Sequence, residues 1–78
     1  MLTVEDLDNL RHMLGVSDRC RRGYRNYFVA GVDDVASMER LRDAGFVVKN
    51  EGYKLSADSC YHATIEGAKA LGLKALPR

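Results

Sequence analysis

Long apolar runs, a secretion signal and a disulfide-rich cysteine pattern are all absent from this sequence. No apolar stretch approaches the roughly 20 residues that a membrane-spanning helix needs, and the N-terminus lacks the apolar core of a signal peptide. We therefore expect a cytoplasmic protein that makes no use of a membrane. With 78 residues, the chain is long enough for one domain and too short for two, so residues 1–78 are predicted to form a single domain with a small core.

Cysteine and histidine are too few and too widely spaced to indicate a metal site. Cys20 and Cys60 have no metal-type spacing with His12 or His62. The two cysteines are compatible with a disulfide or with a reduced pair, and we favour the reduced pair because the chain has no disulfide-dense pattern. Cys60 and His62 would share one face of a strand without a third group to orient them. The 7 glycines stand singly and match no phosphate-binding loop. We expect no enzyme, no metal and no cofactor.

A strong excess of charge of one sign is also missing, because the formal net charge is only +1. This removes the usual compositional indication of a nucleic-acid partner. The distribution of charge is nevertheless uneven. Five arginines lie between Arg11 and Arg25 against a single acid, Asp18, whereas acids dominate the segments on both sides. Such segregation can serve binding.

Three helices are predicted from apolar spacing and from capping residues. Thr3 and the acids after it favour a helix over Val4–Leu14 that ends at Gly15. A second helix is predicted over Asp34–Ala44, with Gly45 as a left-handed residue at its end. Thr64 is a typical N-cap for a third helix, which begins at Ile65 and ends at Gly72. We expect the second helix to expose these polar side chains: Ser37, Glu39, Arg40, Arg42 and Asp43.

The remaining segments carry weaker patterns. Residues 17–31 have no strong helical stripe, and we expect a helical turn or two over Ser17–Arg22, then irregular or helical chain that brings Tyr27 and Phe28 into the core. A β-hairpin is predicted from Phe46–Val48, turn residues at 50–52, and a returning strand at 60–63. Residues 73–78 are expected to be a frayed tail.

This order of elements resembles a winged helix-turn-helix domain. Residues 38–47 (MERLRDAGFV) are similar to the end of a recognition helix that enters the wing, and residues 61–67 (YHATIEG) are similar to the strand-to-helix junction after the wing in bacterial regulators. Residues 22–26 (RGYRN) are also similar to a segment of small phage-encoded proteins. The resemblance implies an α+β, winged-helix-like domain with three or four helices and a two-stranded wing. It also implies homodimerisation, because many such regulators pair through terminal helices, and Leu71, Leu73 and Leu76 would extend an apolar surface there.

Two groups of residues are candidates for binding. If the helix over 34–44 entered a DNA major groove, Ser37 and Arg40, together with Arg42, would reach base edges. Four acids on or beside this helix make a solvated mixed-charge face an equally good interpretation. The second group combines guanidinium groups that bind phosphate with tyrosines that supply contact area. Its members are Arg19, Arg21, Arg22, Tyr24, Arg25 and Tyr27, with Lys49 and Lys54 on the wing.

Two functional hypotheses follow from these candidates. The first is a small nucleic-acid-binding protein, such as a phage or prophage DNA-binding regulator of transcription. The second is a protein-binding module, such as a phage-encoded inhibitor of a host defence complex (an anti-CRISPR protein). Arginine and tyrosine also dominate protein interfaces, so the sequence alone does not choose between DNA and a host protein complex as the partner.

Overall fold

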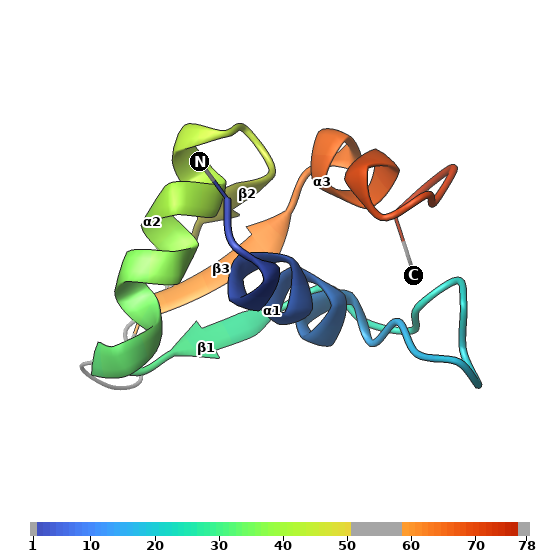
Figure 1. Ribbon diagram of the computed structural model, residues 1–78, viewed down its shortest axis with the longest axis horizontal. Helices are drawn as coiled ribbons and strands as arrows, with labels where there is room; N and C mark the ends of the chain where they lie inside the picture. Colours follow the sequence, from blue (N-terminus) through green and yellow to red (C-terminus); the bar gives the residue numbers. More distant parts are fainter. Residues whose placement is uncertain (1, 51–58, 77–78) are drawn as a thin grey trace.

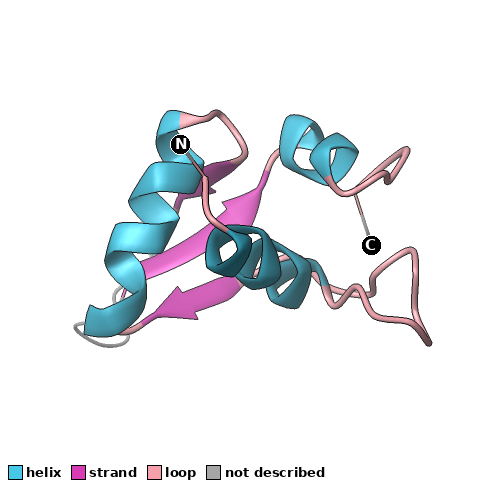
Figure 2. Ribbon diagram, viewed as in Figure 1, coloured by secondary structure: helices cyan, strands magenta, loops and turns pink. Residues whose placement is uncertain are grey.

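Three α-helices and a three-stranded antiparallel sheet make up the computed structural model, which describes residues 2–50 and 59–76 (Figures 1 and 2). The elements follow in the order α1 (Val4–Leu14), β1 (Phe28–Ala30), the 3-10 helix η1 (Val32–Asp34), α2 (Val35–Asp43), β2 (Val47–Lys49), β3 (Ser59–Ala63) and α3 (Ile65–Ala70). The described part of the chain contains no helix that is both long and apolar enough to cross a membrane.

The three predicted α-helices are confirmed, and their ends follow from the predicted capping residues. The Thr3 hydroxyl accepts from the backbone N–H of Asp6 at 3.1 Å, and the Asp6 carboxylate accepts from the backbone N–H of Thr3 at 3.0 Å. This reciprocal pair is a capping box. Gly45 adopts φ +81° after α2, as predicted, and the Thr64 hydroxyl caps α3 through the N–H of Gly67.

The predicted antiparallel ribbon is also confirmed. Val47 of β2 lies opposite Ala63 of β3, and Lys49 lies opposite Tyr61. The turn between the two strands falls outside the described residues, and so does Lys54. The sequence did not predict β1, which pairs antiparallel with the other edge of β3, so that the strand order is β1-β3-β2. The sheet therefore has three strands where the sequence predicted two.

Residues 17–31 differ from the prediction in two further ways. Ser17–Arg22 forms bends and turns instead of helix. Phe28 packs partly against the core as predicted, but the prediction that Tyr27 enters the core is wrong, because 53% of this residue is exposed. Successive residues at a strand entry point to opposite sides, so Phe28 and Tyr27 cannot both face the core.

One face of the sheet is covered by α1 and α2, and the core lies between these layers (Figure 1). Side chains alternate along β3: Tyr61 and Ala63 are buried, whereas His62 is exposed. In the tail, Leu73 and Leu76 are partly buried and lie against the core. The buried apolar residues are Leu10, Met13, Leu14, Ala30, Met38, Leu41, Val47, Tyr61, Ala63 and Ala68.

The first turn of α3 is packed directly on the turn between α2 and β2. The Thr64 backbone N–H donates to the carbonyl of Phe46 at 3.0 Å, and its hydroxyl donates to the carbonyl of Gly45 at 2.7 Å. Gly67 lies so close that a Cβ atom there would come far inside van der Waals contact with the Phe46 carbonyl oxygen. The position therefore requires glycine although it lies within a helix.

Replacing Gly67 by alanine is expected to lower the free energy of unfolding by about 1–3 kcal/mol, because overpacking against a backbone atom displaces the turn. Because the contact at Gly67 is so close, we expect the upper part of this range, which outweighs the helix propensity that alanine gains over glycine, about 1 kcal/mol. Urea denaturation of Gly67→Ala and Gly31→Ala would measure it. Gly31 has φ −75° and nothing within 4 Å of an added Cβ, so its variant should stay within about 0.5 kcal/mol of wild type. Equal stability of both variants would contradict the packing described here.

Candidate nucleic-acid interface

A buried carboxylate at the start of α1 binds the polar residues that were predicted to read DNA bases. Asp6 is 0% exposed. Its Oδ1 atom accepts from the hydroxyl of Ser37 at 2.6 Å, and its two oxygens accept from Nε and a terminal nitrogen of Arg40, both at 2.8 Å. The amide of Asn9 donates to the Ser37 hydroxyl at 2.9 Å. These bonds join α1 to α2.

The carboxylate is fully ionised in this environment. The Arg40 guanidinium, together with the donors from Ser37 and Thr3, holds the pKa of Asp6 well below its usual range against the opposing effect of burial. Arg40 is bidentate to Asp6, and its pKa is raised in turn. Two opposite charges in one hydrogen-bonded pair leave little field at the surface of α2.

The prediction that α2 exposes Ser37 is wrong, because this residue is only 3% exposed. The Ser37 hydroxyl can be buried because it donates a hydrogen bond to the buried Asp6 carboxylate. Both arginines of α2 are paired with acids, Arg40 with Asp6 and Arg42 with Glu39 at 3.3 Å. The structure therefore buries Ser37, ties the partly exposed Arg40 to the buried Asp6, and leaves α2 without an unpaired arginine.

The loop from Gly15 to Tyr27, which we call the arginine loop, caps the C-terminus of α1. The last four carbonyls of a helix have no partner within the helix, and here all four accept backbone N–H groups of this loop. The donors Val16, Gly15, Tyr27 and Tyr24 bond, in that order, to the carbonyls of Arg11, His12, Met13 and Leu14 at 2.9 to 3.2 Å. Gly15 supports the reversal with φ +68°. The loop is thus fixed by the helix although it has no regular structure.

Arg25 adds a side-chain cap to the same helix end. Its Nε and one terminal nitrogen donate to the carbonyl oxygen of His12 at 3.0 and 2.6 Å. The guanidinium carbon lies 5.6 Å from the ring centre of Tyr24 and 5.5 Å from that of Tyr27. A guanidinium group has five N–H bonds, and two of them are used here. Tyr24, Arg25 and Tyr27, predicted as binding residues, are therefore brought together by the end of α1.

Asn26 is a positioning residue that the sequence analysis missed. Its side-chain oxygen accepts from the backbone N–H of Ala63 at 2.7 Å, and its side-chain nitrogen donates to the carbonyl of Ala63 at 3.2 Å. The amide thus pairs with the end of β3 as a strand backbone would. An asparagine between an arginine and a tyrosine in an irregular loop carries no spacing signal, so it could not be recognised without the fold.

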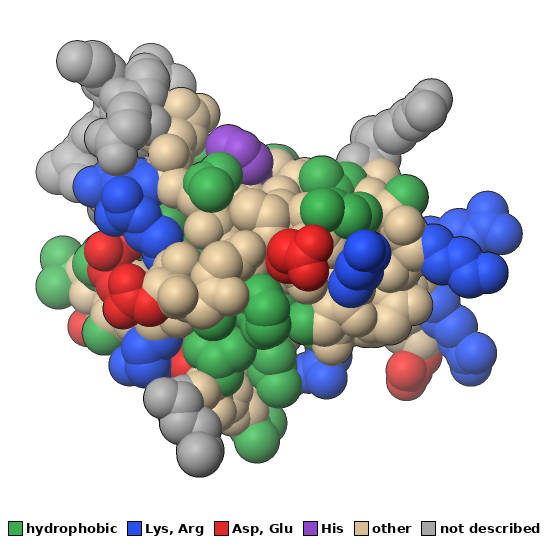
Figure 3. Space-filling model, turned by 90° about the horizontal axis from the view of Figure 1, so that it is seen from above, with side chains coloured by type: hydrophobic (Ala, Val, Ile, Leu, Met, Phe, Trp, Pro, Cys, Tyr) green, Lys and Arg blue, Asp and Glu red, His purple; other side chains and the backbone are tan. Residues whose placement is uncertain are grey.

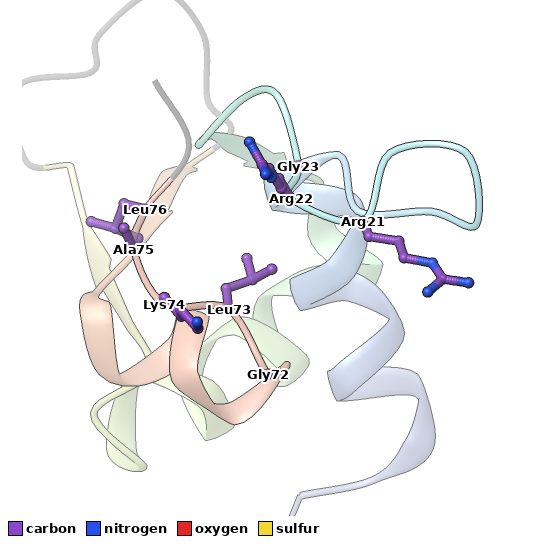
Figure 4. Close-up of a pocket in the computed structure, with 8 residues that line it drawn as sticks. All are labelled: Arg21, Arg22, Gly23, Gly72, Leu73, Lys74, Ala75 and Leu76. Carbon is purple, nitrogen blue, oxygen red and sulfur yellow. The ribbon is translucent and has the colours of Figure 1, made fainter.

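A cleft of ≈ 660 Å³ lies between the arginine loop and the C-terminal tail, lined by Arg21, Arg22, Gly23 and residues 72–76 (Figure 4). Leu73 extends into the space between the two segments, whereas Arg21 extends outward from its rim. Lys74 contributes a further cation from a segment far away in sequence, and no acid is found among the described residues that line the cleft. Lys74 was not expected at a site because the tail was predicted to fray.

The other predicted cations do not join this cleft. Arg19 is exposed on the same loop but does not line the cleft. Lys49 lies on β2, which β3 separates from β1, and it does not line the cleft either. Figure 3 shows lysine and arginine side chains at both ends of the molecule. Those at one end lie among several acidic side chains, whereas those at the end where Figure 1 places the arginine loop and the tail have fewer acidic neighbours on the face shown.

The uncovered face of the sheet is the other surface of note. Val29 of β1 and Val48 of β2 are 40% and 41% exposed, and Val48 lies opposite the exposed His62. Cys60, opposite Val29, and Cys20 are both free thiols. Among the residues that the structure describes, no three His, Cys, Asp or Glu side chains are arranged to hold a metal ion.

Comparison of this chain with protein-family models, with curated proteins and with solved structures gives no match.

The network around Asp6 predicts a specific loss of stability in acid. Because its pKa is lowered by folding, the stability that Asp6 contributes is complete above the usual value of 3.8 and is lost as the pH falls from there towards the folded-state pKa. At neutral pH, Asp6→Asn is expected to cost about 1–3 kcal/mol, because it leaves partners of the carboxylate unsatisfied. Urea denaturation from pH 7 to pH ~2.5 would measure both effects.

Asp8→Asn is the matched control for this experiment. Asp8 lies on the same helix and pairs with Arg11 at 2.7 Å, but both side chains are largely exposed, so the change should cost no more than about 1 kcal/mol. The difference between wild type and Asp6→Asn should shrink below pH ~4. A constant difference across this range would contradict the assigned ionisation of Asp6.

Proposed function

We propose that this chain is a small nucleic-acid-binding protein and that the arginine loop, rather than α2, carries the contact. The supporting observation is that Arg21, Arg22 and Lys74 all line one cleft, Arg21 at its rim, and that no acid is among its described lining residues. Guanidinium and ammonium groups are the side chains that bind phosphate. The chain is nearly neutral overall, but this end of the molecule presents unpaired positive charge to a polyanion.

The geometry of α2 supports the same choice. A helix that reads a major groove needs side chains that can leave the protein and reach base edges. Ser37 and Arg40 are held by Asp6, and Arg42 is paired with Glu39. The acids Asp33 and Asp34 lie immediately before α2 and would approach the phosphates first. Removing α2 from the interface leaves the arginine loop as the strongest candidate.

A winged-helix-like architecture is part of this proposal. It is supported by the ribbon of β2 and β3 that follows α2 and by the restart of helix at Thr64. One α-helix, preceded by the short η1, connects β1 to β2, so a pair of adjacent helices for groove reading is replaced by a single helix. Within this architecture, a phage or prophage regulator that contacts phosphates from its loop is the proposed role.

A protein-binding module remains the second candidate because of the uncovered sheet face. Val29 and Val48 are exposed large apolar residues on this face, and the exposed tyrosines and arginines of the loop are of the types that form hot spots in protein interfaces. An inhibitor of a host defence complex would use these surfaces against a protein. Pull-down from host lysate with and without nuclease treatment separates the two classes, because only a nucleic-acid-mediated association is lost on digestion.

The proposal predicts how the salt dependence of binding changes when charge is removed from the cleft. Each phosphate contact contributes about 0.9 to the slope of log K against log salt for duplex DNA and about 0.7 for single strands. The double variant Arg21→Ala, Arg22→Ala should therefore reduce that slope by about 1.4 to 1.8. Fluorescence anisotropy titrations with labelled oligonucleotides at several salt concentrations would measure it.

Arg42→Ala is the control, because it removes an exposed arginine that is paired with Glu39 and does not line the cleft. Its slope should equal that of wild type. If total charge rather than the cleft determined binding, Arg42→Ala would lower the slope by about half as much as the double variant, because it removes one cation instead of two. Absence of binding to any nucleic acid at low salt would overturn the proposal.

A further inference from the structure

Two tyrosine rings project from the arginine loop into solvent. Tyr24 is 63% exposed and Tyr27 is 53% exposed, although large aromatic side chains in small domains are usually needed for the core. Both rings lie beside the guanidinium group of Arg25, with centres 5.6 and 5.5 Å from its carbon atom. The arrangement is an exposed aromatic platform with a positive charge at its middle.

The platform is held in place before any ligand arrives. The backbone N–H groups of Tyr24 and Tyr27 bond to the carbonyls of Leu14 and Met13. The Tyr24 ring lies against Gly15, where an added Cβ atom would come within 2.5 Å of it. Arg25 is fixed by its two bonds to the carbonyl of His12. Binding to this platform would therefore cost little ordering entropy.

Two hollows adjoin the platform, and each has one of the tyrosines in its wall. One hollow, of ≈ 290 Å³, is lined by His12, Gly15, Val16, Ser17, Tyr24 and Arg25. The other, of ≈ 280 Å³, is lined by His12, Arg25, Tyr27, Phe28, Val29 and Asp34. They share His12 and Arg25 and differ in their tyrosine. A polymeric ligand with flat groups repeated along its backbone could therefore place one such group in each hollow.

The charges beside the two hollows indicate the chemistry of the ligand. Arg25 has three N–H bonds besides the two that serve His12, and these can donate to a phosphate. Arg21 and Arg22 precede the platform in sequence, separated from Tyr24 by Gly23. Among the described residues that line the two hollows, Asp34 is the one acid. Alternating flat bases and phosphates satisfy both the rings and the cations.

Exposed rings of this kind distinguish single strands from duplexes. In a duplex both faces of each base are stacked on neighbouring bases, so a tyrosine on a protein surface cannot reach them without unstacking. Bases of a single strand are free to stack on aromatic side chains, while a positive groove follows the backbone.

Resting on the proposed nucleic-acid function, we infer that the ligand of this chain is single-stranded nucleic acid. Successive bases occupy the two hollows and stack on Tyr24 and Tyr27, and the phosphate between them is bound by Arg25. The strand continues towards Arg22 and the cleft beside the C-terminal tail. This makes the tyrosines, rather than any residue of α2, the main source of affinity beyond charge.

The test compares an oligothymidylate of about 12 nucleotides, within the site size of single-strand binders, with a hairpin duplex of equal phosphate number. By fluorescence anisotropy, wild type should bind the single strand more tightly. Tyr24→Ala and Tyr27→Ala should each weaken single-strand binding by about 5- to 140-fold, the range for loss of one stacked base, and leave duplex binding nearly unchanged. Tyr24→Phe and Tyr27→Phe keep the ring and should retain most of the affinity.

A second measurement on the unmodified protein guards against variants that fail to fold. The chain has no tryptophan and 4 tyrosines, so stacking should quench part of the tyrosine emission when oligothymidylate is added, and the duplex should quench less. Thermal unfolding followed by circular dichroism identifies any variant that has lost its structure.

The outcomes separate the inference from the function on which it rests. Equal affinity for both nucleic acids, with no effect of the alanine variants on either, would overturn the stacking inference and leave the proposed function standing. Loss of affinity in the phenylalanine variants as large as in the alanine variants would also overturn it. No binding to either nucleic acid would overturn both and leave protein binding as the surviving hypothesis.

Discussion

The C-terminus of α1 is the constraint from which the candidate interface follows. Four backbone carbonyls there need donors, and the arginine loop supplies them from its own backbone, with Arg25 as an additional donor. Unsatisfied polar groups are costly to bury, so the loop has a strong reason to hold one conformation. The same bonds position Tyr24 and Tyr27 in solvent next to Arg25. They also place Phe28 at the start of β1.

The opposite end of α1 explains why the binding surface is not on α2. The capping box positions Asp6 at the first turn, where its carboxylate is buried and needs strong donors. Ser37 and Arg40 provide them across the helix contact. An uncompensated buried charge would be far more damaging than the loss of a surface arginine. One helix therefore determines both that Arg40 is held in an ion pair and that the arginines of the loop stay available.

Elements with local signals could be predicted from the sequence. Thr3, Thr64, Gly15 and Gly45 mark helix ends through their own backbone and side-chain chemistry, so the three helices were predicted closely. The ribbon was found because its strands are apolar and separated by turn residues. In contrast, β1 is a strand of three residues whose pairing with β3 depends on chain that is distant in sequence, and no local period reveals it.

The candidate site was predictable to the same degree. The arginine and tyrosine residues of the loop were identified from their composition, but their arrangement depends on the carbonyls of α1. Ser37 was assigned to the surface because it lies among the polar residues of α2, and Asp6, which holds it in a buried position, is 31 residues away. Arg40 keeps a partly exposed side chain, but it is bound by the same carboxylate 34 residues away. Asn26 and Lys74 were missed for the related reason that each acts through a segment remote in sequence. Polar residues acquire their roles from tertiary partners, whereas caps and apolar stripes do not.

The near-zero net charge results from an uneven distribution, in which, among the described residues, the cations of α1 and α2 are paired with acids and those of the loop and the tail are not. The described acids include several that neutralise specific cations: Asp6 with Arg40, Asp8 with Arg11, and Glu39 with Arg42. Pairing of this kind removes positive charge from α1 and α2 without affecting the loop and the tail, where the cleft shared by Arg21, Arg22 and Lys74 has no acid among its described lining residues. At physiological salt the screening length is about 8 Å, so a polyanion at the cleft responds to these nearby cations far more than to the total charge. A chain with a formal charge of +1 can therefore present a basic surface at one end, and its binding properties have to be judged from the positions of its ion pairs.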